Sequence, residues 1–213
     1  MADLTFYTNP QSRGQIVRWM LEEVGAPYET VLLDYGTTMK APDYLALNPM
    51  GKVPAIRHGD AVVTEGAAIC AYLADTFPDA GLAPSAGSPD RGAYYRWLFF
   101  GAGPVEMAVT NRYNKWDPTP EQEAMVGYGS YTRVLDMLEQ LVGRGPYLLG
   151  ERFSAVDVYL GSQIIWGTQF GTMEKRAGFE EYIGRVTGRE AYQRAKAIDG
   201  KLIAEAQAAQ QQG

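Results

Sequence analysis

The sequence has almost none of the side chains that build disulfide frameworks or soft metal sites. It contains one cysteine, Cys70, and one histidine, His58, among 213 residues. Disulfide scaffolds need cysteines in pairs, and zinc sites are commonly built from several cysteines and histidines. A disulfide framework, a Cys/His zinc site and a cysteine–histidine catalytic pair are therefore all disfavoured, and we expect no metal cofactor.

Long apolar runs and an excess of positive charge are also missing. No stretch of about 18 apolar residues occurs, and the N-terminal MADLTFYTNPQ has neither a basic nor an apolar signal region. We therefore expect a cytoplasmic chain that does not span a membrane. The formal net charge is −6, from 19 Lys and Arg against 25 Asp and Glu, and it repels polyanions. Binding to nucleic acid is not expected.

The hydrophobic fraction of 46% and the charged fraction of 21% are those of an ordinary globular protein. The first 80 residues alternate between strand-like and helix-like patterns. Strand patterns occupy residues 4–8, 28–33, 53–56 and 61–63. Helical periodicity occupies a stretch that ends near Gly25 and the stretch 65–77, and a short helix is expected between 34 and 49. The predicted order is βαβαββα, with a four-stranded mixed sheet.

The second half of the chain has almost no strand pattern. Pro, Gly, Ser and Asp concentrate in the turn-forming segment 78–90 (PDAGLAPSAGSPD), which we interpret as a linker. Helical patterns follow at 91–109, 120–141, 154–166, 179–188 and 189–207. The predicted organisation is thus an α/β domain over 1–80, a linker over 81–90 and an all-α domain over 91–213.

Four motifs, in this order and spacing, resemble the cytosolic glutathione transferase family over nearly the full length: TFYTNPQSRGQIVRWMLEEVGAPYE, NPMGKVPAI, TEGAAICAYLAD and GERFSAVDVYL. The resemblance implies a thioredoxin-like glutathione-binding domain, a helical domain for a hydrophobic electrophile, glutathione as co-substrate and a homodimer. It implies a transferase that conjugates glutathione, as in detoxification. A glutathione-dependent isomerase or dehalogenase, and a non-catalytic binding module on the same fold, stay open as alternatives.

Ser12 stands where the first strand gives way to the first helix, in Asn9-Pro10-Gln11-Ser12-Arg13. A helix N-terminus stabilises an adjacent anion, and a hydroxyl there can donate a hydrogen bond to a thiolate. Serine is also a preferred helix cap, and from local sequence alone capping is the better explanation of this residue. The resemblance to serine-type members implies that Ser12 is the catalytic residue.

Lesser candidates for stabilising the thiolate are Tyr7 of the first strand and Asn9 and Arg13 of the turn. Asn9 and Arg13 are also expected to contact glutathione. Arg13 stands where cysteine-dependent bacterial members carry their cysteine, which excludes a mixed-disulfide mechanism at this turn.

The remaining glutathione contacts are implied by the resemblance at two further junctions. Pro54 is expected to be cis, so that the Val53 backbone pairs with the peptide backbone of glutathione. Glu65 and Gly66 open the next helix and suit the γ-glutamyl zwitterion. Most relatives carry serine or threonine where Gly66 stands, so one hydroxyl contact is lost here. Lys40 and Lys52 are candidates for the glycyl carboxylate, although isolated surface lysines often stay solvated.

Residues of the helical half complete the expectations. Asn111, Tyr113, Trp116 and Trp166 are the candidates for holding an apolar electrophile, because ligand pockets are mostly apolar with few polar groups. Ser154 and Asp157 have the spacing of a reciprocal capping box, which predicts a structural role.

In the α/β half, Cys70 is predicted to be a buried hydrophobe and His58 to be solvated at a hairpin tip.

Overall fold

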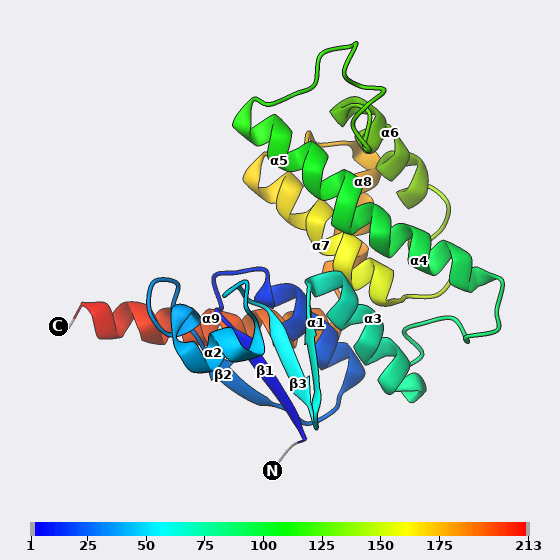
Figure 1. The fold of residues 1–213 in the computed structure, drawn as a ribbon. Coiled ribbons are helices and arrows are strands. Elements are labelled where there is room, and N and C mark those ends of the chain that lie inside the picture. Colours follow the sequence, from blue (N-terminus) through cyan, green and yellow to red (C-terminus); the bar gives the residue numbers. More distant parts are fainter. Residues whose placement is uncertain (1–2, 212–213) are drawn as a thin grey trace. The chain divides into compact units, whose positions relative to one another are not determined.

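The computed structural model describes residues 3–211, and Figure 1 shows how their helices and strands are connected. The first elements are β1 (Leu4–Thr8), α1 (Gly14–Val24), β2 (Glu29–Leu32), the 3₁₀ helix η1 (Thr38–Lys40), α2 (Pro42–Leu47), β3 (Ala55–His58), β4 (Ala61–Thr64), α3 (Gly66–Thr76) and the 3₁₀ helix η2 (Pro78–Ala80). They are followed by α4 (Asp90–Phe100), the π-helical turn η3 (Gly101–Val105), α5 (Glu106–Asn114), α6 (Tyr131–Val142), α7 (Ala155–Phe170), α8 (Ala177–Thr187) and α9 (Glu190–Gln210).

The sheet has the strand order β2-β1-β3-β4. β1 pairs with β2 in parallel and with β3 antiparallel, and β3 pairs antiparallel with β4. This confirms the predicted four-stranded mixed sheet and the order βαβαββα. Leu4 and Phe6 of β1 are buried, whereas β2 is an exposed edge strand.

α1 forms because apolar residues recur along one face, where Ile16, Val17, Met20 and Leu21 are buried. It ends at Gly25, whose φ of 71° is left-handed and whose N–H bonds to the Leu21 carbonyl at 2.9 Å. Glycine takes this conformation without a Cβ penalty, as the sequence predicted.

Two helix predictions in the second half need correction. The expected helix 91–109 extends to Asn114 and contains the π-helical turn around Pro104, because proline lacks the N–H that a regular α-helical ladder requires. The expected helix 120–141 begins only at Tyr131. Residues 120–130 form turns instead, and Gly129 has a left-handed φ of 68° just before Ser130 caps α6 by accepting the Arg133 N–H at 3.4 Å.

The described chain divides into two compact units. One contains the residues up to Ala80 together with those from Arg189 on, and the other spans Gly81–Gly188. The difference from the predicted division lies in α9, which packs on α1 through contacts such as the edge-to-face pair of Trp19 and Tyr192. The last helix therefore belongs by its contacts to the α/β unit.

The second unit is all-helical, and a buried capping box starts its central helix α7. The Ser154 hydroxyl accepts the Val156 N–H at 3.2 Å, and the Asp157 carboxylate accepts the Ser154 N–H at 2.9 Å. The α/β and all-helical units together bear out the fold class expected from the sequence.

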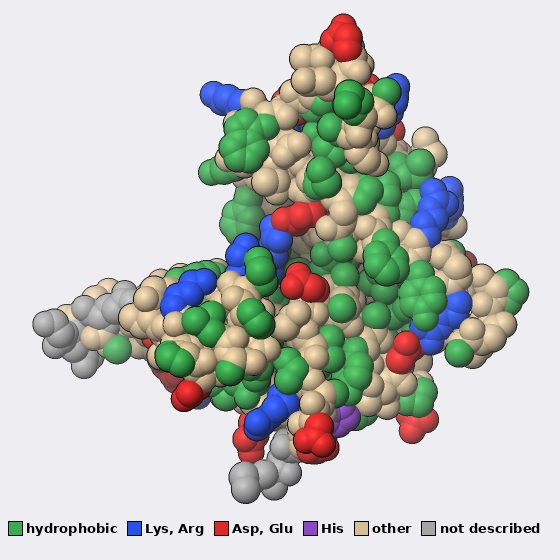
Figure 2. Space-filling view, in the orientation of Figure 1, with side chains coloured by type: hydrophobic (Ala, Val, Ile, Leu, Met, Phe, Trp, Pro, Cys, Tyr) green, Lys and Arg blue, Asp and Glu red, His purple; other side chains and the backbone are tan. Residues whose placement is uncertain are grey.

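Charged side chains are spread over the surface. On the face shown in Figure 2, Lys and Arg side chains of the described residues are interspersed with acidic ones and do not form one continuous basic stripe. Within residues 3–211, no helix combines the length and apolarity that crossing a membrane requires.

Candidate functional site

The strand register brings three predicted segments to one end of the sheet. Thr8, the last residue of β1, pairs with Leu32, the last residue of β2. Tyr7 pairs with Ala55, the first residue of β3, and Ala55 pairs with Thr64, the last residue of β4. The Ser12 turn, the Val53-Pro54 peptide and Glu65 therefore all lie at the same end of the sheet.

The turn after β1 is fixed by a network of short hydrogen bonds. The Asn9 side chain donates to the Leu33 carbonyl at 2.9 Å and accepts the Gln11 N–H at 3.0 Å. The half-buried Ser12 hydroxyl donates to the Asn9 carbonyl at 2.6 Å and accepts the Gly14 N–H at 2.9 Å. Ser12 thus makes a capping contact at the start of α1, and its hydroxyl must rotate away from Asn9 to donate to a ligand.

The other candidates for stabilising the thiolate, in β1 and in the turn, are oriented differently. The Tyr7 ring is partly buried and packs against Tyr44, with ring centroids 5.8 Å apart, in a cluster that also contains Met39 and Val53. Arg13 precedes the first turn of α1 with an exposed side chain and makes no side-chain cap. Ser12 is therefore the residue whose hydroxyl bonds the first N–H of α1.

The Val53-Pro54 peptide bond is cis, as the sequence analysis predicted. The segment before it is supported from α2, because Tyr44 and Asn48 both donate side-chain hydrogen bonds to the Lys52 carbonyl. Lys40 is directed to the same turn and donates to the Gly51 carbonyl at 2.6 Å, while Lys52 itself is exposed. Of the two lysines, Lys40 is thus the one that is hydrogen-bonded within the turn.

Asn48 was missed by the sequence analysis, although a signal was present. Asn48-Pro49 repeats the Asn9-Pro10 dipeptide, and each asparagine side chain accepts the N–H two residues on, from Gln11 at 3.0 Å and from Met50 at 3.1 Å. Asparagine before proline favours such turns. Both segments at this end of the sheet therefore use the same local device.

Glu65 adopts a backbone conformation that the sequence did not predict. Its φ is 66° and its ψ 119°, outside the helical region, at the residue immediately before α3. A positive φ at a residue other than glycine costs of order 1–3 kcal/mol and persists only where the surroundings enforce it. The exposed carboxylate of Glu65 and the first N–H groups of α3, which begins at Gly66, lie together here.

The four electrophile candidates lie in the helical unit. Asn111, on α5, donates to the Tyr128 hydroxyl at 3.0 Å, and its carbonyl accepts the Trp116 N–H at 2.8 Å. Tyr113 and Trp116 are 73% and 66% exposed, and Trp166 is half-buried on α7. The end of α5 thus brings the first three together, whereas Trp166 comes from a separate helix.

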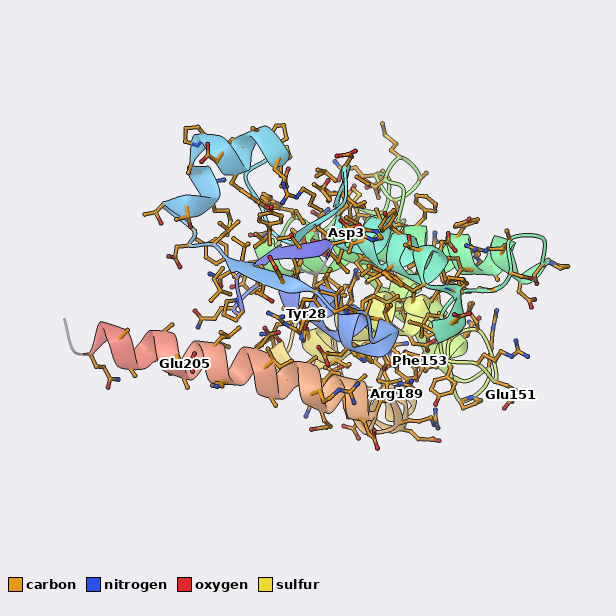
Figure 3. All side chains as sticks on the ribbon, turned by 90° about the horizontal axis from the view of Figure 1, so that it is seen from below. Asp3, Tyr28, Glu151, Phe153, Arg189 and Glu205 are labelled. Atoms are coloured by element: carbon orange, nitrogen blue, oxygen red, sulfur yellow. The ribbon has the colours of Figure 1, made fainter. Side chains whose placement is uncertain are left out.

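A cavity of about 680 Å³ in the helical unit is built from other residues. Its walls are the linker, the first turns of α4 and the segment before α7, and the lining includes Pro84, Trp97, Arg144, Arg152 and Phe153. None of the four electrophile candidates is among its lining residues. Glu151 and Phe153, labelled in Figure 3, belong to the segment before α7.

The cysteine and the histidine differ in how well they were anticipated. Cys70 is buried on α3, as predicted, and burial raises the pKa of its thiol, which keeps it in the neutral form. The prediction for His58 was wrong, because the ring is half-buried. Its Nδ1 lies 3.0 Å from the Tyr72 hydroxyl, and the ring stacks on Phe77. Within residues 3–211, no group of His, Cys, Asp or Glu side chains is arranged to hold a metal ion.

Comparisons with known proteins agree on one family. Residues 12–76 match the model of the glutathione S-transferase N-terminal domain, and residues 122–166 match that of the C-terminal domain. Glutathione S-transferase 3 of Zea mays is 31% identical over 74% of this chain and 75% of its own length.

Two solved structures are similar over nearly their whole length. A glutathione transferase from Methylococcus capsulatus is 31% identical with a TM-score of 0.74, covering 92% of this chain and 98% of its own. A sphingomonad glutathione S-transferase, solved in complex with glutathione, is 28% identical with a TM-score of 0.73 and the same coverage.

Proposed function

Because this chain belongs to the glutathione S-transferase family, we propose that it binds glutathione and conjugates it to apolar electrophiles. The observation that carries the proposal is the strand register, which brings the Ser12 turn, Val53-Pro54 and Glu65 to one end of the sheet. Glutathione has a thiol, a peptide backbone and a zwitterionic γ-glutamyl group, and these segments offer one partner for each.

Ser12 is proposed to stabilise the thiolate. Its hydroxyl rotates from the Asn9 carbonyl, 2.6 Å away, and donates to the sulfur, while the N-terminus of α1 adds its partial positive charge. A free thiol has a pKa of about 8.5, and such a setting lowers it to between about 3.5 and 7.5. A drop of about two units corresponds to roughly 2.7 kcal/mol, within reach of one charge-assisted hydrogen bond and a helix dipole.

The rest of the tripeptide is proposed to bind through backbone and charge. The Val53 N–H and C=O pair with the cysteinyl backbone, with the Val53-Pro54 bond cis. Glu65 accepts from the γ-glutamyl ammonium, and the N–H groups at Gly66 meet its carboxylate. Lys40, Lys52, Asn9 and Arg13 are proposed as further contacts of the tripeptide.

The reaction is proposed to be nucleophilic addition or substitution. The thiolate of glutathione attacks an electrophilic carbon, a carbon–sulfur bond forms, and in a substitution the leaving group departs with its electron pair. The protein contributes orientation and a lowered thiol pKa, and glutathione supplies the nucleophile. Asn111, Tyr113, Trp116 and Trp166 are proposed to hold the electrophile.

We further propose a cytoplasmic homodimer. Large apolar side chains are exposed on the described surface, including Phe99 at 73% and Met50 at 66%. Such side chains would be covered if they gathered in an interface with a second copy. Light scattering of the purified protein tests this, and a monomer mass at micromolar concentration would contradict it.

A glutathione affinity column and a conjugation assay with a generic aryl halide test the function together. We expect retention on the column, elution by free glutathione, and release of halide in proportion to the conjugate formed. Retention without turnover of any aryl halide or epoxide would favour a binding module, and no retention would contradict the proposal.

A further inference from the structure

Arg18, in the middle of α1, is a buried charge that joins distant parts of the α/β unit. It is only 2% exposed. Its Nε lies 3.2 Å from Oδ1 of Asp199 on α9, and its Nη1 donates to the Tyr28 hydroxyl at 3.0 Å and the Thr30 hydroxyl at 2.8 Å. The guanidinium carbon lies 4.9 Å from the centre of the Phe6 ring of β1. One side chain thus contacts both neighbouring strands and the last helix.

Burial of this pair is poorly explained by stability alone. Asp199 is also 2% exposed, and burial raises the pKa of its carboxyl. Within residues 3–211, Nη2 of Arg18 is buried without a hydrogen-bond partner. A buried ion pair can often be replaced by apolar residues at little or no cost, so its presence calls for another role.

Further polar contacts between α1 and α9 flank Arg18. Arg189 holds both carboxylate oxygens of Glu23 at 2.7 Å, and Lys196 donates to the Gln15 side chain at 3.0 Å. Figure 3 shows α9 running from Arg189 towards Glu205, with Tyr28 on the neighbouring segment. Hydrogen bonds are directional whereas apolar contacts are not. These contacts therefore fix the position of α1 along and around its axis.

The first residue of α1 is coupled to Ser12. The Gly14 N–H donates to the Ser12 hydroxyl at 2.9 Å. The backbone here is pressed so closely to β1 that a Cβ on Gly14 would lie 1.9 Å from Thr8 Oγ1. A shift or rotation of α1 therefore moves the N–H group to which the Ser12 hydroxyl is bonded.

We propose that Arg18, paired with Asp199, is a positioning residue for the proposed reaction: it anchors α1 and so keeps the Ser12 hydroxyl where it can turn from Asn9 to the glutathione thiolate. This rests on the proposed function. A displacement of a reacting group by about 1 Å can cost a factor of roughly 100 in rate, so a side chain that contacts no ligand can control the chemistry. The last helix of the chain then belongs to the catalytic machinery of the first domain.

The test uses the double variant Arg18→Leu/Asp199→Leu, which removes both charges and keeps apolar volume. Its control is Lys201→Ala/Glu205→Ala, which removes an exposed ion pair of 3.8 Å from the same helix. For each protein, the Tm, the Kd for glutathione, kcat/KM and the pH midpoint of thiolate absorbance of bound glutathione are measured.

We expect the Leu double variant to melt within about 5 °C of the parent and to bind glutathione within about threefold. Its thiol midpoint should rise by about one unit, and kcat/KM should fall roughly 10- to 100-fold. The control should match the parent. A Leu double variant with the parent's midpoint and kcat/KM would overturn the proposal and leave Arg18 a structural residue.

Arg18→Lys keeps the test decisive where the double variant fails to fold. Lysine retains the charge beside Asp199 but lacks the planar fork that reaches Asp199, Tyr28 and Thr30 together. We expect a folded protein with a raised thiol midpoint and a severalfold lower kcat/KM, and parent-like values would overturn the proposal. A parent protein without any thiolate signal would instead contradict the proposed function.

Discussion

The clearest stability prediction concerns Asp157, whose side chain is completely buried in the helical unit. Its carboxylate accepts the N–H groups of Leu148 at 2.8 Å and Ser154 at 2.9 Å, and the hydroxyls of Ser154 at 3.2 Å and Tyr182 at 3.1 Å. Both ends of the segment before α7 are thus held by one side chain. The sequence indicated only the capping contact to Ser154.

Asp157→Ala should cost more than the roughly 1 kcal/mol of a lost cap. It leaves two backbone N–H groups and the Tyr182 hydroxyl without their acceptor, at about 1–3 kcal/mol for each group that water cannot reach. We expect a loss of about 3–5 kcal/mol in the free energy of unfolding, or roughly 6–20 °C in Tm for a chain of this size. Activity per folded molecule should change little.

The pH dependence gives a sharper test of the same site. Burial raises the pKa of Asp157 from 3.8 to about 6, against the opposing effect of its hydrogen bonds. Because the folded-state pKa lies above the unfolded value, the folded protein binds more protons between about pH 4 and 6. This contribution to stability is fully present below about pH 4 and is lost as the pH rises through about 6.

The comparison is between the parent and Asp157→Asn, which keeps the shape and cannot titrate. Urea unfolding at pH 7.0 and 4.5 gives the difference in unfolding free energy, in which the other titrating groups cancel. We expect the parent to gain about 2 kcal/mol relative to Asp157→Asn on acidification. A difference that stays constant, or that moves in favour of the asparagine variant, would refute the reasoning about burial.

Gly14→Ala should lower both the Tm and kcat/KM, because its Cβ would lie 1.9 Å from Thr8 Oγ1. The control Gly184→Ala in α8, where no atom lies within 4 Å of the added Cβ, should be neutral or slightly stabilising. Equal effects of the two variants in melting and kinetic assays would rule out the steric account. Cys70→Ser should keep the conjugating activity per folded molecule, because burial keeps the Cys70 thiol neutral and glutathione supplies the reacting sulfur. Loss of activity with intact glutathione binding would mean that the reaction uses the thiol of the protein. Gly66→Ser should lower the Kd for glutathione by roughly 2- to 10-fold in calorimetry, the effect of one added hydrogen bond, and an unchanged or weaker Kd would count against the proposed γ-glutamyl contact.

Local patterns predicted the α/β half of the fold well. The hairpin of β3 and β4 and the cap at Gly25 depend on neighbouring residues, so periodicity and turn chemistry suffice for them. The late start of α6 at Tyr131 and the π-helical turn at Pro104 were missed, because helical composition outweighed the local breakers. The place of α9 depends on contacts such as Arg18 with Asp199, which are 181 residues apart and leave no local pattern.

In the candidate site, too, some features could be predicted from local motifs and others could not. Ser12 and Pro54 stand in recognisable motifs, and the cis bond before Pro54 was implied by the family resemblance that these motifs carry. The positive φ at Glu65 has no signal in the local sequence, whereas the bond from Asn48 to the Lys52 carbonyl, four residues on, belongs to a turn that the Asn48-Pro49 dipeptide indicated. Sequence motifs thus point to candidate site residues more readily than to the residues that hold them in place.

The measurement that tests the central claim most directly is a pH titration of thiolate absorbance for glutathione bound to the parent and to Ser12→Ala. Ser12→Thr, which keeps a hydroxyl, is the matched control and should behave nearly as the parent. The account predicts that Ser12→Ala raises the thiol pKa by about one to two units and lowers kcat/KM by roughly 10- to 150-fold, with a much smaller change in glutathione affinity. An unmoved thiol pKa with an undiminished rate would show that Ser12 is only a helix cap, and would direct the search to Tyr7, Asn9 and Arg13.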